Sequence, residues 1–190
     1  MTASLILASA SPRRLALLAQ IGITPSRVEP ADIDETATAQ ELPRPHALRI
    51  ATAKARTVHA RAPGAVILAA DTVVACGRRI LPKAEDDATV TKCLAILSGR
   101  RHTVITAVAI VDIAGKLKNR IVETKVAFRR LDAQEIAAYV QSAEGLGKAG
   151  GYAIQGRAAA FVRAINGSYT NVVGLPLTET LHMLKACGAA

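Results

Sequence analysis

The sequence predicts an α/β fold with a mixed β-sheet. Short apolar runs typical of strands alternate along the chain with segments of helical periodicity. Two of these runs, Thr103–Val111 and Ile121–Phe128, are separated by a polar segment that contains Asp112 and Gly115. This pattern indicates an antiparallel hairpin, so a wholly parallel sheet is not expected. The length of 190 residues, with 51% hydrophobic and 21% charged residues, is typical of one globular domain, expected over residues 1–190.

The individual elements follow from apolar runs and from helix start and stop signals. The expected strands are Leu5–Ala8, Val66–Ala70 with Val73–Cys76, Thr103–Val111, Ile121–Phe128 and Ala159–Ile165, with Asn171–Val173 as a weaker candidate. The expected helices are Pro12–Gln20, Pro45–Arg61, Asp87–Leu97, Asp132–Val140 and Pro176–Lys185. Asp132 and Glu135 have the spacing of a capping box, which predicts where the fourth helix begins.

The segment Leu5–Arg14 is the first candidate for a binding site. An apolar run ends at small hydroxyl residues and leads into a helix with Ser11 as N-cap and Pro12 at the first helical position. Arg13 and Arg14 then place two cations in the first helical turn, where the helix dipole favours anions. A phosphate bound there would resolve this conflict; the alternative is that both guanidinium groups point into water.

Charge and composition narrow the function classes. The net charge of +9 suits nucleic acid, an anionic membrane surface or a phosphorylated small molecule. The chain has no Trp, two Phe and three Tyr, which disfavours single-stranded nucleic acid because such binders stack bases on aromatic side chains. No apolar run is long enough for a membrane span or placed as a signal peptide, so a cytoplasmic protein is expected. The three cysteines and four histidines lack the spacing of disulfide or zinc motifs.

Asp71 is the next candidate, because apolar strand residues stand on both sides of it. A carboxylate in such a strand is costly to bury without a partner, so we expect it to be paired or functional, unless it lies exposed at a strand end. Its open roles are ligation of a divalent cation and polarisation of a water molecule. By itself, the acidic cluster Asp32–Glu35 is typical of a solvated loop. Beside a phosphate site, however, Asp34 or Glu35 could help to hold Mg²⁺.

Other candidate motifs are weaker from local pattern alone. Lys54 and Lys83 each read as surface lysines. Gly145–Gly150 has the glycine spacing of a dinucleotide-binding loop, but it follows a helix and opens none, which argues against that assignment. Gln155 lies between apolar and glycine residues, where its amide could contact a uracil or thymine edge or bind backbone. No Walker A motif occurs.

Five motifs, taken in order, resemble those of the Maf family of nucleoside triphosphate pyrophosphatases, and the resemblance covers nearly the whole chain. They are Ser9–Arg14, Ala70–Val73, Ser98-Gly99 with His102, Lys148–Gly156 and Val173–Pro176. The resemblance implies a mixed, curved sheet flanked by helices with a central cleft, related to the fold of inosine triphosphate pyrophosphatases. It also implies hydrolysis of a nucleoside triphosphate to the monophosphate and pyrophosphate, with a divalent cation (Mg²⁺ or Mn²⁺) as cofactor.

The resemblance also suggests roles for individual residues. Asp71 corresponds to the family's catalytic acid, Glu35 to a second carboxylate near the metal, and Lys54 and Lys83 to cationic partners of the triphosphate. Substrate binding is expected from Ser9, Arg13, Arg14, Thr72 and Gln155. Arg13, Thr72 and Gln155 match positions tied to substrate choice, and the Tyr-x-Ile-Gln-Gly form resembles the subfamily that acts on dTTP and UTP. Modified pyrimidine nucleotides stay open as the substrates.

Two positions depart from the family pattern, and two other functions stay open. Ala84 stands where members commonly have proline after the lysine, and Gly147 stands where they commonly have an acid. Within the family, the alternative substrate is 7-methyl-GTP. Outside it, the charge would suit a non-catalytic basic regulatory or nucleic-acid-binding protein. The expected partner is a small nucleoside triphosphate, with neither a membrane nor nucleic acid, and the sequence leaves a homodimer open.

Overall fold

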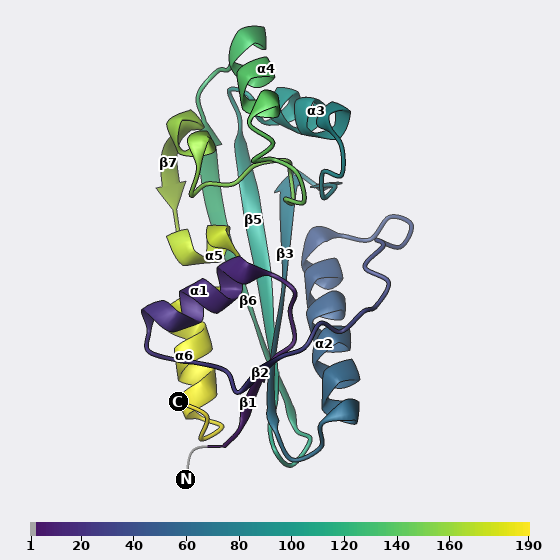
Figure 1. Ribbon diagram of the computed structural model, residues 1–190. Helices are drawn as coiled ribbons and strands as arrows, with labels where there is room; N and C mark the ends of the chain where they lie inside the picture. Colours follow the sequence, from purple (N-terminus) through teal and green to yellow (C-terminus); the bar gives the residue numbers. More distant parts are fainter. Residues whose placement is uncertain (1–2) are drawn as a thin grey trace.

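The computed structural model describes residues 3–190 and has one mixed seven-stranded sheet wrapped by helices on both faces (Figure 1). The strand order is β2-β1-β3-β5-β6-β7, and β4 pairs with β3 outside this path. β2, β1 and β3 are parallel to one another, whereas all pairings from β3 through β5 and β6 to β7, and that of β4, are antiparallel. The predicted α/β class with a mixed sheet is therefore confirmed.

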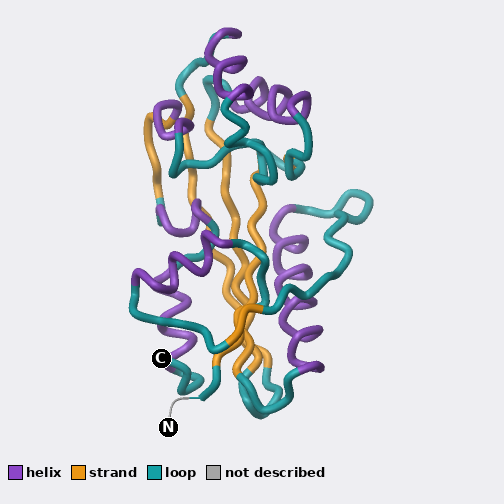
Figure 2. Tube along the Cα trace, viewed as in Figure 1, coloured by secondary structure: helices purple, strands orange, loops and turns teal. Residues whose placement is uncertain are grey.

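The strands differ greatly in length. They are β1 (Leu5–Leu7), β2 (Arg27–Val28), β3 (Val66–Cys76), β4 (Arg79–Leu81), β5 (Arg101–Val111), β6 (Leu117–Phe128) and β7 (Val162–Asn166). Figure 2 shows that the long strands β3, β5 and β6 run the length of an elongated molecule, while β1 and β2 lie near one end of it and β7 lies beside the other. The expected hairpin is β5–β6, with Arg101 paired to Ala127 and Val111 to Leu117.

The helices lie at the ends and on both sides of these long strands. They are α1 (Pro12–Gln20), α2 (Pro43–Arg61), α3 (Asp87–Leu97), α4 (Ala133–Gln141), the 3-10 helix η1 (Arg157–Phe161), α5 (Tyr169–Val173) and α6 (Leu177–Lys185). In Figure 1, α1, α2 and α6 surround one half of the sheet, and α3 and α4 cover the other end. None of the helices among residues 3–190 is both long and apolar enough for a bilayer crossing.

Alternation along β3 sends its side chains into two separate cores. Ile67, Ala69 and Val73 belong to the core that packs against α2, while Leu68 and Val74 belong to the larger core on the opposite face. Successive residues of a strand point to opposite faces of the sheet, so neighbouring positions of β3 serve different helices. The small side chains Ala47, Ala51 and Ala55 allow α2 to lie close to its face of the sheet.

Three expectations for the elements were wrong in detail. Asn171–Val173 is not a strand but part of helix α5, because Ser168 Oγ accepts a hydrogen bond from Asn171 N and caps the helix. The expected strand Ala159–Ile165 begins as η1 and becomes β7 only at Val162. Ser11 occupies the N-cap position of α1, but its hydroxyl makes no capping bond; Ser9 Oγ instead accepts from Ser11 N at 3.2 Å.

The short strands β2 and β4 were not predicted from sequence. With two and three residues, they are too short to show alternation. The capping box at the start of α4 is confirmed, since Asp132 accepts from Glu135 N and Glu135 accepts from Asp132 N. Helix α2 begins two residues earlier than expected, at Pro43, because proline fits the first turn of a helix.

Candidate active site

The candidate site lies at an interruption along one edge of β3. β1 pairs with β3 only as far as Leu68, and β4 pairs with the same edge only from Val74. Within residues 3–190, the intervening stretch of β3, which contains Asp71 and Thr72, therefore has no strand neighbour on that side. The chain leaves β1 at this point and enters α1, so the first turn of α1 meets the open part of β3. Carboxyl ends of parallel strands followed by helix starts are common ligand sites in α/β proteins.

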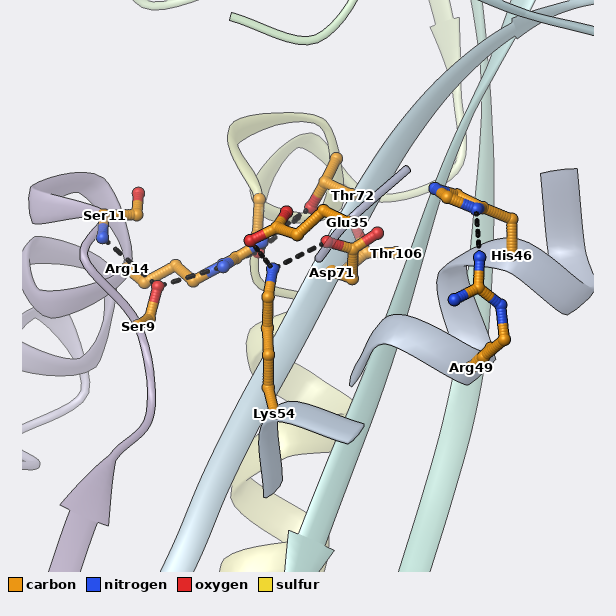
Figure 3. Close-up of polar contacts among 11 residues, drawn as sticks. Ser9, Ser11, Arg14, Glu35, His46, Arg49, Lys54, Asp71, Thr72 and Thr106 are labelled. Atoms are coloured by element: carbon orange, nitrogen blue, oxygen red, sulfur yellow. Dashed lines mark hydrogen bonds and ion pairs between the residues drawn. The ribbon is translucent and has the colours of Figure 1, made fainter. Parts of the chain in front are cut away.

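Three charged groups form the inner part of the site. Lys54 Nζ lies 2.9 Å from Asp71 Oδ1 and 2.9 Å from Glu35 Oε1, so one ammonium group joins two carboxylates (Figure 3). The side chains of Lys54 and Asp71 are only 10% and 9% exposed, whereas that of Glu35 is 55% exposed. Asp71 is thus a buried, paired acid, as its apolar surroundings in the sequence suggested, and Lys54 is not a surface lysine. Glu35 comes from the loop between β2 and α2.

Arg14 forms a second buried group beside the first. Its Nε donates to the Gly174 carbonyl at 2.9 Å, its Nη1 to Ser9 Oγ at 3.0 Å and its Nη2 to Thr72 Oγ1 at 3.2 Å. Three of the five guanidinium N–H groups are therefore used, and in the described part of the chain the other two have no protein acceptor. Burial lowers the pKa of Arg14, while the negative charges of Asp71 and Glu35 raise it.

A network of hydroxyl and amide groups holds Arg14 and Thr72 in place. Thr72 Oγ1 and Thr106 Oγ1 are 2.9 Å apart at directly paired positions of β3 and β5. Thr106 Oγ1 donates to the carbonyl of Asn171, and the Asn171 amide donates to the Val104 carbonyl and to Thr124 Oγ1. Thr106, Thr124 and Asn171 are fully buried. The position of Arg14 is thus fixed from the sheet and from α5 at once.

Arg13, Lys83 and Lys148 form an outer group of cations. The pKa of Lys148 is lowered by burial and by the nearby positive charges of Arg13 and Lys83. Backbone pairing brings the two lysine segments together, because Ala84 N donates to the Lys148 carbonyl at 3.0 Å and Lys83 pairs with Ala149. Arg13 is half-buried, Lys83 is exposed, and none of the three cations forms an ion pair within residues 3–190. This group is suited to a polyanion.

Gln155 lies apart from the inner group. It is an exposed turn residue just before η1, between buried Ile154 and half-buried Gly156. Within the described residues its side chain makes no hydrogen bond to Asp71, Lys54 or Arg14. Gln155 is therefore not part of the hydrogen-bonded inner group.

The residues of the inner group are a plausible cation site only together with a ligand. Two carboxylates share one positive charge, that of Lys54. No group of three or more His, Cys, Asp or Glu side chains suited to a metal exists within residues 3–190. Mg²⁺ commonly binds one or two protein carboxylates and completes its shell with phosphate oxygens and water. The donor set fits that kind of metal, and it does not fit a closed structural site.

Reasoning from sequence missed two parts of the site. Lys148 lies in a glycine-rich motif, and its residue type alone indicates no role. The signal that could have identified it is the turn formed by Gly147 and Gly150, both with positive φ, which could present its side chain. The Gly174 carbonyl was missed because a backbone acceptor leaves no residue-type signal; only the position of Gly174 directly after α5 hints at it.

Comparisons with known proteins identify a family model and relatives that match nearly the whole chain. A family model described as Maf-like protein matches residues 4–187. A protein of Rhodospirillum rubrum named dTTP/UTP pyrophosphatase is 62% identical over 97% of this chain and 88% of its own length. A protein of the same name from Caulobacter vibrioides is 60% identical over 97% of this chain and 96% of its own.

Among solved structures, a nucleoside-triphosphatase described as a dITP/XTP pyrophosphatase from Mycobacterium abscessus aligns with a TM-score of 0.47. It is 24% identical and covers 68% of this chain and 74% of its own.

Proposed function

The chain belongs to the Maf-like protein family, and we propose that it is a nucleoside triphosphate pyrophosphatase that converts dTTP and UTP to the monophosphate and pyrophosphate. The observation that carries this proposal is the pair of carboxylates joined by Lys54 and adjoining a buried arginine with unused donors. Relatives 60% and 62% identical bear the name dTTP/UTP pyrophosphatase, which supports the substrate assignment.

The reaction requires a water molecule to attack the α-phosphorus while the bond from this phosphorus to the bridging oxygen breaks. The Asp71 carboxylate orients the water and accepts its proton, and the pyrophosphate departs with the bridging oxygen. Lys54 pairs with the Asp71 carboxylate, which fixes its position, and offsets charge on the α-phosphate. Phosphoryl transfer depends mainly on positioning and charge stabilisation, and these groups supply both.

The remaining cations bind the rest of the triphosphate. Arg14 directs its unused donors to phosphate oxygens, and Arg13 and Lys83 neutralise the β- and γ-phosphates from the outer group. Ser9 supports this arrangement by accepting from both Arg14 and the Ser11 amide. A bound divalent cation, Mg²⁺ or Mn²⁺, would supply Lewis-acid stabilisation of the phosphate oxygens, with Asp71 and Glu35 as its protein ligands.

Substrate choice is assigned to Arg13, Thr72 and Gln155. Gln155 offers both a donor and an acceptor, which a uracil or thymine edge requires, and its exposed turn leaves the amide accessible to a base. Thr72 acts indirectly, because its hydroxyl already contacts Arg14 and Thr106. The names of the relatives favour neither 7-methyl-GTP as substrate nor a non-catalytic role.

The first prediction concerns Asp71. We expect Asp71→Asn to lower kcat for dTTP and UTP by at least about 100-fold, the lower end of the usual contribution of a positioned acid or base. Pyrophosphate should be measured separately from orthophosphate, with dTTP, UTP, CTP, GTP and 7-methyl-GTP as substrates and Mg²⁺ or Mn²⁺ present. The fold should survive, because Lys54 keeps its contact with Glu35.

The matched control is Asp87→Asn, which changes an exposed aspartate in the first turn of α3. It should retain the activity of the unmodified chain. Near-normal turnover by Asp71→Asn would remove Asp71 from the mechanism. Release of orthophosphate in place of pyrophosphate would show attack at a different phosphorus.

A further inference from the structure

Glu35 depends on a loop for its position. It lies between β2 and α2, outside any helix or strand, and its only charged contact in the described chain is with Lys54. The same segment includes Asp32 and Gln40 at φ values of 48° and 60°, which non-glycine residues rarely adopt. A loop with such strained positions keeps one conformation only where tertiary contacts impose it. The contacts that hold this loop therefore decide where the Glu35 carboxylate lies.

Arg49 of α2 makes the most extensive of these contacts. Its Nε donates to Glu41 Oε1 at 2.7 Å and its Nη2 to Glu41 Oε2 at 2.7 Å, which is a bidentate pair. The same Nη2 donates to the backbone carbonyl of Thr36 at 3.0 Å, directly after Glu35. One guanidinium group thus ties together the two ends of the Thr36–Glu41 stretch. Figure 3 shows Arg49 and His46 on α2, near the Lys54 group.

Arg49, Glu41 and the Thr36 carbonyl together form a contact that we call the clip. Glu41 is its member on the loop. Its carboxylate also accepts from Thr38 N at 3.0 Å and contacts His46 Nδ1 at 2.9 Å. The side chain of Glu41 is 9% exposed, and its hydrogen bonds to Arg49 hold its pKa well below the ordinary range. Arg49 itself is 40% exposed, so the strength of this pair rests on its bidentate geometry and on the further hydrogen bonds of the Glu41 carboxylate.

We propose that Arg49 is a positioning residue for Glu35. Through Glu41 and the Thr36 carbonyl, it fixes the loop against α2 so that the Glu35 carboxylate meets Lys54 and Asp71. Lys54 lies five positions further along the same helix, so α2 carries both the clip and the cation that Glu35 contacts. The inference rests on the proposed function, because Glu35 matters only if it binds the metal. Within the described residues Arg49 makes no hydrogen bond or ion pair to Glu35, Lys54 or Asp71, so its influence on them passes through the loop.

The first test compares Arg49→Met with Arg56→Met, a control on an exposed arginine of the same helix. Groups that orient a metal ligand typically change activity or metal affinity by about 10–100-fold when removed. We expect Arg49→Met to raise the Mn²⁺ concentration for half-maximal dTTP hydrolysis by about tenfold or more. Arg49→Lys keeps the charge but loses the bidentate pair. Its Mn²⁺ concentration for half-maximal hydrolysis should therefore lie between those of Arg49→Met and Arg56→Met. Arg56→Met should match the unmodified chain.

A double-mutant cycle separates positioning of Glu35 from a general loss of stability. If Arg49 acts through Glu35, Arg49→Met should lower kcat in the unmodified chain but cause no further loss in Glu35→Gln. A decrease of the same size in both backgrounds would overturn the proposal. An unchanged Mn²⁺ requirement in Arg49→Met would also overturn it.

Hydrogen exchange supplies a readout that needs neither metal nor activity. The amide of Thr36 donates to Asp34 and that of Thr38 donates to Glu41, so both report on the loop. In Arg49→Met these amides should exchange faster, while protection in β3 and β5 stays unchanged. Unchanged protection of the loop would contradict the proposal. If Glu35→Gln alone kept full turnover and an unchanged Mn²⁺ requirement, the role assigned to Glu35 would fail, whereas an altered loop would still support the clip.

Discussion

At the scale of single residues, Lys54 and Asp71 show how burial and charge are combined. A buried charge without a partner is costly, and removal of one member of a buried pair leaves the other uncompensated. Here the cost is contained, because Glu35 gives Lys54 a second and more exposed carboxylate. Lys54 and Asp71 are thus paired inside the fold, while the Glu35 carboxylate stays reachable from solvent. Such an arrangement suits a site that must accept a triphosphate and a cation.

His102 provides a residue-scale prediction for stability. Its ring is 2% exposed, its Nε2 contacts the Tyr152 hydroxyl at 2.8 Å, and its edge packs against Phe128. Burial lowers the pKa of His102 to about 4, against about 6.5 in an unfolded chain. Between these two values the unfolded chain binds more protons, so the free energy of unfolding rises with pH and falls on acidification. Acidification through this range should lower the free energy of unfolding by roughly 3 kcal/mol through His102 alone.

The measurement is urea unfolding of the unmodified chain and of His102→Gln at pH 4 to 8. The glutamine amide can still bond the Tyr152 hydroxyl but does not titrate, so the variant should lose the His102 part of the slope between about pH 6.5 and about pH 4. Carboxylates add acid sensitivity to both proteins, so the difference between the two curves is the relevant quantity. Parallel curves would mean that His102 titrates normally.

At the scale of elements, β3 brings two sets of helices to one site. Asp71 lies on the face of the sheet that packs against α2, and there it contacts Lys54. Thr72 lies on the opposite face and contacts Arg14 of α1. Adjacent residues of one strand thus contact different helices, because side chains alternate between the faces. The site needs no strand beside this stretch of β3, and the short β1 and β4 leave it open.

The two departures from the family pattern, Ala84 and Gly147, meet at the same place in the structure. Gly147 N donates to the Ala84 carbonyl at 2.7 Å, and Ala84 N donates to the Lys148 carbonyl at 3.0 Å. Proline at position 84 could not make the second bond. Gly147 has φ 69°, where an acid would be strained. Together these residues pair the loop that carries Lys83 with the loop that carries Lys148.

This pairing yields an element-scale prediction. Ala84→Pro should lower the free energy of unfolding by on the order of 1 kcal/mol, because the Lys148 carbonyl loses its donor. Amides of residues 147–150 should exchange faster, which hydrogen exchange can measure. Ala84→Ser is the control, since it adds an atom at this buried position but keeps the N–H. Equal effects of proline and serine would assign the loss to crowding instead of to the hydrogen bond.

At the scale of the whole molecule, the cations that contribute to the net charge of +9 include two groups at the candidate site, one inner and one outer. Part of this charge is internal, in Arg14 and Lys54, where it lies next to Asp71 and Glu35. Another part is carried by Arg13, Lys83 and Lys148, where the charges of Arg13 and Lys83 act on Lys148. We expect a small polyanion to contact both groups at once. A duplex would meet only the outer one, since the inner side chains are buried.

Salt dependence tests this distribution of charge. Partly buried charges are screened less than exposed ones, so the KM for dTTP should rise less than about tenfold between 50 and 200 mM salt. Duplex DNA held by 6–10 phosphate contacts would lose about 10³–10⁵ in affinity over the same range. Steady-state kinetics and fluorescence anisotropy measure the two quantities. Tight DNA binding with a steep salt dependence, together with no turnover, would favour the regulatory alternative.

Much of the fold followed from local pattern. The long β5–β6 hairpin, the capping box of α4 and the bounds of α1 and α3 all carry signals within a few residues of sequence. The prediction of a strand at Asn171–Val173 was wrong, because apolar content over so short a stretch does not distinguish a strand from a helix. The capping bond of Ser168 favours helix α5 there. Two-residue β2 exists only through its pairing with β1.

The sequence by itself determined which residue types could carry chemistry: an acid within an apolar strand, two arginines at a helix start and an acidic loop before a basic helix. Those are local features, set by burial cost, capping and the helix dipole. Only the tertiary structure decided that Lys54 faces Asp71, that Arg14 binds Gly174 and that Arg49 holds the loop of Glu35. Such contacts join residues 13 to 160 positions apart, and their pairing depends on strand order and helix packing, which no local pattern encodes.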